Sequence, residues 1–134
     1  MHELSLVDGI VRAVEERAQE KGGRVTGVKV GIGELAQFDL RVVRGLLKDL
    51  KKGTILQDAR VTVEPEKARV VCLSCNSEWA FKDLAPSLSK DEKEAIHFIP
   101  ELFSSYFQCP KCSKSYFEIL EGRSVRLIEV TFDV

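Results

Sequence analysis

The stretch CLSCNSEWAF, residues 72–81, contains a Cys-x-x-Cys turn, and CPKCSKSYFE, residues 109–118, contains a second one. The two stretches resemble each other, since each places an aromatic residue, Trp79 or Tyr116, four positions after its second cysteine. Zinc is bound by four thiolates in a tetrahedron at about 2.3 Å. The near-repeat therefore predicts two similar zinc knuckles that face each other around one ion. The expected ligands are Cys72, Cys75, Cys109 and Cys112.

Two other uses of these cysteines are less consistent with the rest of the chain. The N-terminus lacks a secretory signal and no apolar run could span a bilayer, so we expect a cytoplasmic protein whose thiols stay reduced rather than forming disulfides. A thioredoxin-like context, which a redox role for Cys-x-x-Cys would need, is missing. Four cysteine ligands also leave no open position on the metal, so a structural site is expected rather than a metal-dependent enzyme.

The overall charge balance bears on the partners. Lys and Arg number 20 against 21 Asp and Glu, for a net charge of −1 and a pI of about 6.2. From this balance we expect no basic stripe on the protein and neither a nucleic acid nor a membrane as a partner. Paired knuckles are nevertheless common in zinc-ribbon interaction or nucleic-acid-binding modules, and that alternative stays open from the residues alone.

Periodicity predicts two helices and a strand before the cysteines. Apolar residues recur at three- and four-residue spacing from Leu4 to Ala18, which predicts an amphipathic helix that ends at Gly22-Gly23. VTGVKVGIG, residues 25–33, alternates like a strand with one buried face. Asp39 can cap a second helix, which Lys51, Lys52 and Gly53 would end.

Three further segments are strand-like. ARVTVEPE, residues 59–66, is expected to end at Pro65, and ARVVC, residues 68–72, leads into the first knuckle. RSVRLIEVTFDV, residues 123–134, changes its buried face at Leu127-Ile128, which predicts a bulge. The natural partners of this last strand are the two strands before the cysteines.

These segments together predict an α+β fold. Residues 1–69 and 119–134 would form a small two-helix, three-stranded domain. A zinc-ribbon-like domain with four cysteine ligands would be inserted over residues 70–118, and it would itself carry a helical insert at about 82–105.

The connection between the knuckles is unusually long, because 33 residues separate Cys75 from Cys109. Ser89 and Glu92 form a capping-box pattern, and Pro100 would kink or stop the helix that follows. The apolar residues expected to make its buried stripe are Ala95, Phe98, Ile99 and Leu102.

His97 falls off that stripe, near Lys90 and Lys93. It is therefore interpreted either as a solvated surface histidine or as a functional group such as a metal ligand.

The first residues of the chain could chelate a metal. A free amine on Met1, the amide nitrogen of residue 2 and the imidazole of His2 would form fused chelate rings. Amide nitrogens lose their proton only to metals that favour square-planar nitrogen fields, which are Ni(II) and Cu(II). Glu3 could add its amide nitrogen or its carboxylate. The alternative is that His2 is incidental at the start of a helix.

The start MHELSLVDGIVRAVEERA, residues 1–18, taken with the two knuckles and the closing strand, resembles the HypA/HybF family. These proteins are nickel metallochaperones of [NiFe]-hydrogenase maturation, and the long connection indicates a long-insert, archaeal type. The resemblance implies one Ni(II) bound by Met1, His2 and Glu3 and a structural Zn(II) on the four cysteines. It also implies delivery of nickel with a HypB-type GTPase to the hydrogenase large subunit, without enzymatic activity.

Two expectations go beyond that resemblance. We hypothesise that His97 supplies a further nickel ligand, because no histidine other than His2 and His97 exists in the chain. We also expect a monomer or a homodimer, the latter open to domain swapping through hinges near residues 70 and 118.

Overall fold

The computed structural model describes residues 3–36 and 38–133, and it divides into two compact units. The first unit comprises Met1–Ile32, Phe38–Pro65 and Val125–Val134, and the second comprises Gly33–Gln37 and Glu66–Ser124. Both units mix helices with a three-stranded sheet, which confirms the α+β fold class. Among the described residues, no helix is long and apolar enough to span a membrane.

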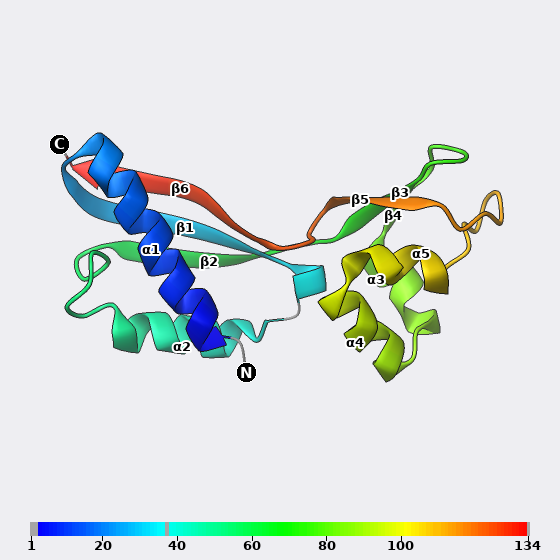
Figure 1. Cartoon of the computed structure of the whole chain (residues 1–134), viewed down its shortest axis with the longest axis horizontal. Coiled ribbons are helices and arrows are strands. Elements are labelled where there is room, and N and C mark those ends of the chain that lie inside the picture. The colour runs from blue at the N-terminus through cyan, green and yellow to red at the C-terminus, as the bar shows by residue number, and fades with distance from the viewer. Residues whose placement is uncertain (1–2, 37, 134) are drawn as a thin grey trace. The chain divides into compact units, whose positions relative to one another are not determined.

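The first unit packs two helices against a sheet. Helices α1 (Glu3–Lys21) and α2 (Leu40–Leu50) lie with strands β1 (Arg24–Gly33), β2 (Arg60–Glu66) and β6 (Val125–Asp133), whose order is β2-β1-β6 (Figure 1). Both helices and the strands contribute to one apolar core. That core includes Val7, Val14, Val28, Val30, Val43 and Leu47.

Local signals set the ends of these helices as the sequence predicted. The side chain of Asp39 accepts hydrogen bonds from the backbone N–H groups of Arg41 and Val42 and so caps α2. Helix α1 ends at Lys21, and Gly22 follows with a φ of +69°.

The strand register confirms the bulge near the end of the chain. Strand β6 pairs antiparallel with β1, and the partners change from Lys29 with Glu129 to Val30 with Leu127, so that Ile128 is the extra residue. The expected end of β2 at Pro65 is wrong, because β2 continues to Glu66. Proline is tolerated there because β2 lies at the edge of the sheet.

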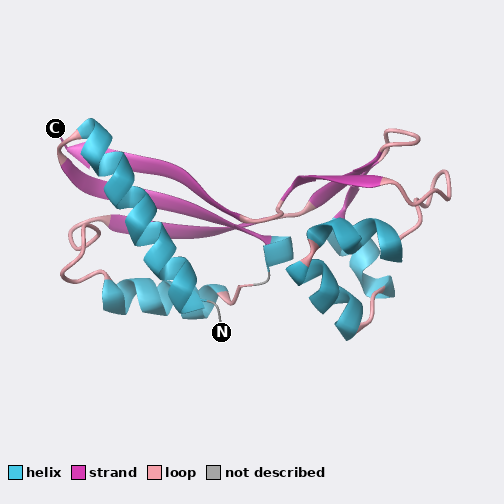
Figure 2. Cartoon of the chain, in the orientation of Figure 1, coloured by secondary structure: helices cyan, strands magenta, loops and turns pink. Residues whose placement is uncertain are grey.

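The second unit holds the two Cys-x-x-Cys turns and the helical insert. Its sheet has the order β4-β3-β5, from β4 (Glu78–Ala80), β3 (Arg69–Cys72) and β5 (Phe117–Glu121) (Figure 2). Three α-helices, α3 (Phe81–Leu84), α4 (Lys90–Phe98) and α5 (Phe103–Tyr106), lie in the insert. Short 3-10 helices of the same unit span Glu34–Ala36, Ala85–Ser87 and Pro100–Leu102.

The insert differs from expectation in which side chains it buries. Ser89 and Glu92 do form the capping box, and α4 ends before Pro100. However, Ile96 is the buried residue of α4, while Phe98 and Ile99 are 67% and 53% exposed. The expected stripe through Phe98 and Ile99 is wrong. Within α4 the buried position is Ile96, and Ile99 lies beyond the end of the helix, where helical spacing no longer applies.

The expected domain boundaries also need correction. Residues 33–36 belong to the second unit, where Leu35 is fully buried in the core and its N–H donates to the carbonyl of Gly122. The carboxylate of Glu34 accepts from the N–H of Ala68 at 2.9 Å, and Ala68 is in the same core. The second unit therefore starts before residue 70 and reaches past residue 118.

Gly122 is predicted to be indispensable to the packing of this segment. Its φ is +81°, and a Cβ there would lie 2.4 Å from the Cα of Ala68. We expect Gly122→Ala to lower the free energy of unfolding by at least about 2 kcal/mol in urea denaturation followed by circular dichroism. Gly45→Ala is the matched control, because nothing lies within 4 Å of its Cβ position inside α2, and alanine should stabilise the protein by about 0.5–1 kcal/mol. Equal unfolding midpoints for Gly122→Ala and the unsubstituted chain would contradict this prediction.

Candidate metal centre

The two Cys-x-x-Cys turns bring four sulfur atoms together. The sulfurs of Cys72, Cys75, Cys109 and Cys112 all lie within 4.8 Å of one another, and none forms a disulfide. Across the two turns, Cys72 Sγ lies 3.5 Å from Cys112 Sγ, and Cys75 Sγ lies 3.7 Å from Cys109 Sγ. Four thiolates at zinc-like distances form a tetrahedron with edges of about 3.8 Å. The donor set and its spacing thus fit a tetrahedral ion without large rearrangement.

The two turns have the same backbone structure. In the first, Asn76 N–H donates to the carbonyl of Cys72, and in the second, Ser113 N–H donates to the carbonyl of Cys109. Asn76 and Ser113 both adopt a positive φ, of 63° and 66°. The near-repeat in the sequence therefore corresponds to two equivalent knuckles, as predicted.

The acidities of the thiols differ within the cluster. The Cys75 thiol donates to the Ser77 hydroxyl at 3.3 Å, and once the thiol ionises, hydrogen bonds from that hydroxyl and then from the Ser77 backbone N–H favour the thiolate and lower the pKa of Cys75 to about 6. The backbone N–H of Lys114 favours the Cys112 thiolate, but desolvation and the other sulfurs outweigh it and raise the pKa of Cys112 to about 12. Protein groups alone can therefore hold some of the sulfurs as thiolates but not all four. A divalent cation would remove that limit.

The cluster is built into the core of the second unit. Cys72 and Cys109 are buried, and Trp79 packs against the same core. Aromatic rings extend that core, with the centroids of Phe103 and Phe107 4.3 Å apart. The Ser104 hydroxyl accepts from the N–H of Phe117 and so ties α5 to β5. An ion held by all four cysteines here has a structural role, because no coordination position stays open for a substrate.

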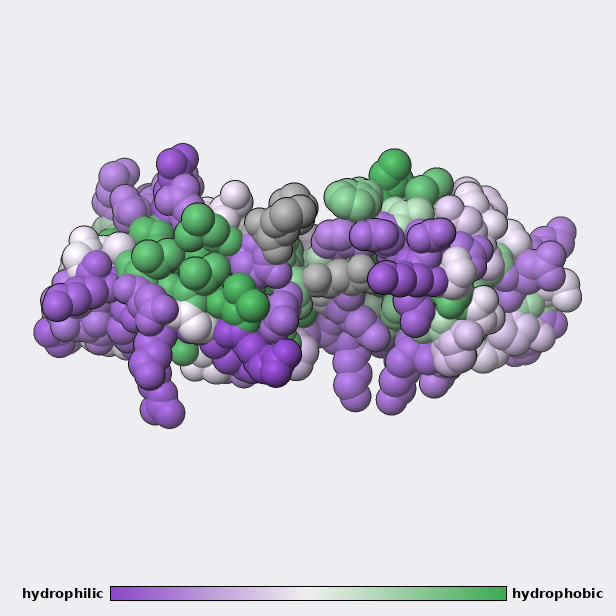
Figure 3. All heavy atoms as spheres, turned by 90° about the horizontal axis from the view of Figure 1, so that it is seen from below, coloured by the Kyte–Doolittle hydropathy of each residue, from purple (hydrophilic) through white to green (hydrophobic). Residues whose placement is uncertain are grey.

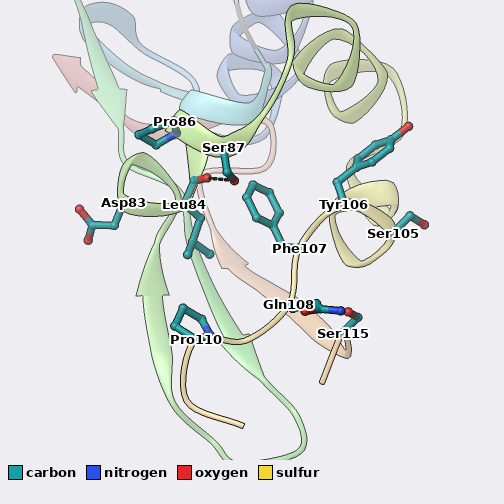
Figure 4. A pocket seen from close by; sticks show the side chains of 10 residues that line it. All are labelled: Asp83, Leu84, Pro86, Ser87, Ser105, Tyr106, Phe107, Gln108, Pro110 and Ser115. Carbon is teal, nitrogen blue, oxygen red and sulfur yellow. Dashed lines mark hydrogen bonds between the residues drawn. The ribbon is translucent and has the colours of Figure 1, made fainter. Parts of the chain in front are cut away.

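A surface groove lies between the insert and the second knuckle. Figure 4 shows Leu84 and Phe107 at its floor, with Pro86 and Pro110 around them. Its volume is about 620 Å³, and Asp83 is the charged side chain of its lining. The sequence did not predict this groove, since its walls come from the insert and from the segments on either side of the second knuckle.

Of the expected nickel ligands, the structure describes Glu3 and His97. Met1 and His2 lie outside the described residues. Glu3 is the first residue of α1, and its carboxylate accepts from the N–H of Asp39 at 3.4 Å, at the start of α2. Because α2 carries a partial positive charge at its N-terminus, this contact holds the carboxylate in place.

Apolar side chains surround the region that follows Glu3. Figure 3 shows hydrophobic side chains gathered on one face of the unit that carries α1 and α2. A groove of about 510 Å³ on this unit is lined by Leu4, Val7, Val11 and Leu50, among others. Leu4 is 59% exposed there. The first turns of α1 therefore border an apolar surface.

His97 lies on α4, in the second unit, and is half-buried. Its Nδ1 is shielded from solvent, and its ring centroid lies 5.1 Å from that of Phe98. His97 is thus partly shielded from solvent, since α4 buries Ile96 and leaves Phe98 and Ile99 exposed. Whether His97 binds nickel stays a prediction.

Comparisons with known proteins agree on one family. The family model described as hydrogenase/urease nickel incorporation, metallochaperone, hypA matches residues 1–132. Two proteins named hydrogenase maturation factor HypA are similar to this chain. The one from Pyrococcus horikoshii is 38% identical over 134 residues, covering 99% of this chain and 96% of the relative. The one from Pyrococcus furiosus is 40% identical over 126 residues, covering 93% and 91%.

A solved structure with a similar fold carries the same family name. The solution structure of the nickel metallochaperone HypA from Helicobacter pylori matches with a TM-score of 0.62. The match covers 98% of this chain and 97% of that chain at 22% sequence identity. At that identity the likeness concerns the fold.

No sequence motif pointed to Ser77, whose hydroxyl is predicted to affect how firmly the cysteines retain a metal. Ser77→Ala should raise the pKa of Cys75, so that protons compete with the metal at higher pH. We expect the pH midpoint of zinc release from the zinc-loaded protein, followed with a chromogenic chelator, to rise by roughly half a unit or more. Ser74→Ala, at an exposed position of the same turn, is the control and should leave the midpoint unchanged. The same midpoint in both variants would show that the Ser77 hydroxyl has no such effect.

Proposed function

The chain belongs to the HypA family, and on that basis we propose that it binds one Ni(II) at its N-terminus and delivers the ion for [NiFe]-hydrogenase maturation. The family is one of metallochaperones for nickel incorporation, so the protein is not an enzyme. The observation that carries the proposal is the family match over residues 1–132, which includes the Met-His-Glu start.

The proposed nickel ligands are the Met1 amine, the amide nitrogen of residue 2, the His2 imidazole and Glu3. The contact between the Glu3 carboxylate and the N–H of Asp39 supports coordination through the backbone nitrogen of Glu3 instead of its side chain. The first N–H groups of an α-helix take no part in its i to i−4 ladder. Deprotonating the amide at the first residue of α1 would therefore cost no hydrogen bond of the helix itself.

The second proposed ion is a structural Zn(II) on Cys72, Cys75, Cys109 and Cys112. Thiolates in a closed tetrahedral site favour zinc, whereas amine, amide and imidazole nitrogens favour Ni(II) or Cu(II). The two sites would therefore sort the metals by ligand type. Zinc would keep the second unit folded, and nickel would be the cargo.

The partners that we propose are a HypB-type GTPase and the hydrogenase large subunit, in the cytoplasm. Four free cysteines suit a reducing compartment. A cargo ion must be released to its recipient, and nitrogen ligands that compete with protons near neutral pH allow release. Monomer and homodimer are both compatible with this role.

The N-terminal site is predicted to depend on His2. Isothermal titration of the zinc-loaded protein with a native N-terminus should give one Ni(II) per chain, and His2→Ala should abolish that binding. A chain with one glycine added before Met1 should lose it too, because the amine would no longer close the same chelate ring. Retained binding in His2→Ala would contradict the terminal chelate, provided that circular dichroism shows an unchanged fold.

His97 is proposed as a further nickel ligand, and this is tested separately from His2. We expect His97→Ala to weaken Ni(II) binding by at least about tenfold and to change the nickel absorption spectrum. Lys90→Ala, on the same helix and exposed, is the control. Unchanged affinity and an unchanged spectrum in His97→Ala would remove His97 from the nickel site while leaving the His2 proposal intact.

A further inference from the structure

Helix α2 carries a row of basic side chains that overall composition conceals. Arg41, Arg44, Lys48 and Lys51 follow one another at intervals of three, four and three residues, which places them along one side of the helix. The expectation that the chain has no basic stripe is therefore wrong. The near-neutral total hides the stripe because acidic residues elsewhere in the chain balance it.

Two of these cations are fixed beside strand β2. The Arg44 guanidinium donates to the carbonyl of Val63 at 2.7 Å, and the Lys51 ammonium donates to the carbonyl of Ala59 at 2.8 Å. Carbonyl acceptors orient these groups without neutralising their charge. The positive charge is thus held along the line where α2 meets the edge strand of the sheet.

No carboxylate pairs with three of these charges within the part of the chain that the structure describes. Arg44, Lys48 and Lys51 form no ion pair with any described residue, and Lys48 and Arg44 are exposed. Arg41 approaches Asp39 at 3.9 Å, but its side chain is 92% exposed. Such an exposed ion pair contributes little free energy.

An apolar depression lies between the basic groups. It has a volume of about 210 Å³ and is lined by Arg44, Leu47, Lys48, Lys51, Val61 and Val63. Its floor is aliphatic and its rim is cationic. The space suits one apolar side chain with a carboxylate on either side of it.

We propose that this depression, the α2–β2 groove, binds an acidic segment of a partner protein. A leucine or similar side chain of the segment contacts Leu47, Val61 and Val63, and flanking carboxylates pair with Arg44, Lys48 and Lys51. Charge complementarity selects the occupant, because three cations that lack an ion-pair partner among the described residues surround the apolar floor. Only a ligand with both apolar and acidic side chains can contact the aliphatic floor and the cationic rim at the same time.

A nucleic acid fits this surface less well. Bases bind proteins by stacking on aromatic side chains, and the lining contains none. An aliphatic floor would also stay empty beneath a phosphate backbone. The protein ligand is therefore the better match, and the nucleic acid becomes an outcome of the test.

The test uses three labelled probes with the zinc-loaded full-length protein. The first is a ten-residue peptide of two Glu-Glu-Leu-Glu-Glu blocks, the second has Ser in place of Leu, and the third is single-stranded DNA of 20 nucleotides. Fluorescence anisotropy should show the leucine peptide binding at least about fivefold more tightly than either other probe. Lys48→Glu should weaken that binding at least about tenfold.

Arg17→Glu is the matched control, because it makes the same change of net charge at an exposed position of α1. It should change peptide binding by less than about twofold, because Arg17 does not line the groove and salt screens exposed charges that are not in contact. Equal losses in the two variants, no binding of the leucine peptide, or tighter binding of DNA would each overturn the proposal. These outcomes leave the proposal of nickel binding by His2 untouched, because the α2–β2 groove and the N-terminal nickel site are tested by different measurements.

Discussion

Four cysteine sulfurs within 4.8 Å of one another are the constraint on which the second unit depends. Hydroxyl and backbone hydrogen bonds lower the pKa of Cys75, but desolvation and the crowding of sulfurs raise that of Cys112. A bound cation lets all four ionise together. The strands β3 and β5 end or begin near these turns, and the helical insert packs on the same core, so loss of the ion would loosen the whole unit.

The proposed nickel site would use nitrogen donors, in contrast to the thiolates of the proposed zinc site. Its donors are nitrogens of the first residues, which bind protons near neutral pH and so can exchange their metal. Glu3 connects that region to the fold through its contact with Asp39 at the start of α2. The protein would thus keep one ion permanently in thiolates and pass the other on from nitrogens, within a chain of 134 residues. The α2–β2 groove would add a means of holding a partner on the unit that contains α1 and α2.

Features set by local signals could be predicted from the sequence. The cap at Asp39, the capping box at Ser89, the bulge at Ile128 and the paired knuckles each depend on a few neighbouring residues. Tertiary choices could not be predicted in this way. Whether Ile96 or Phe98 is buried depends on how α4 packs and where it stops, and Leu35 is held in the second core with the help of a long-range backbone bond to Gly122. Ser77 had no sequence signal beyond its place near Cys75. The basic stripe of α2 could have been predicted from the spacing of its Arg and Lys residues, but the near-zero net charge of the whole chain hid it.

The proposed division of metals, with zinc on thiolates and nickel on N-terminal nitrogens, can be tested directly. X-ray absorption at the zinc and nickel edges of one sample, loaded with one equivalent of each metal, reports the neighbours of both ions. We predict zinc with four sulfur neighbours at about 2.3 Å and nickel with nitrogen or oxygen neighbours alone. Sulfur in the first coordination sphere of nickel, or nitrogen in that of zinc, would contradict this division.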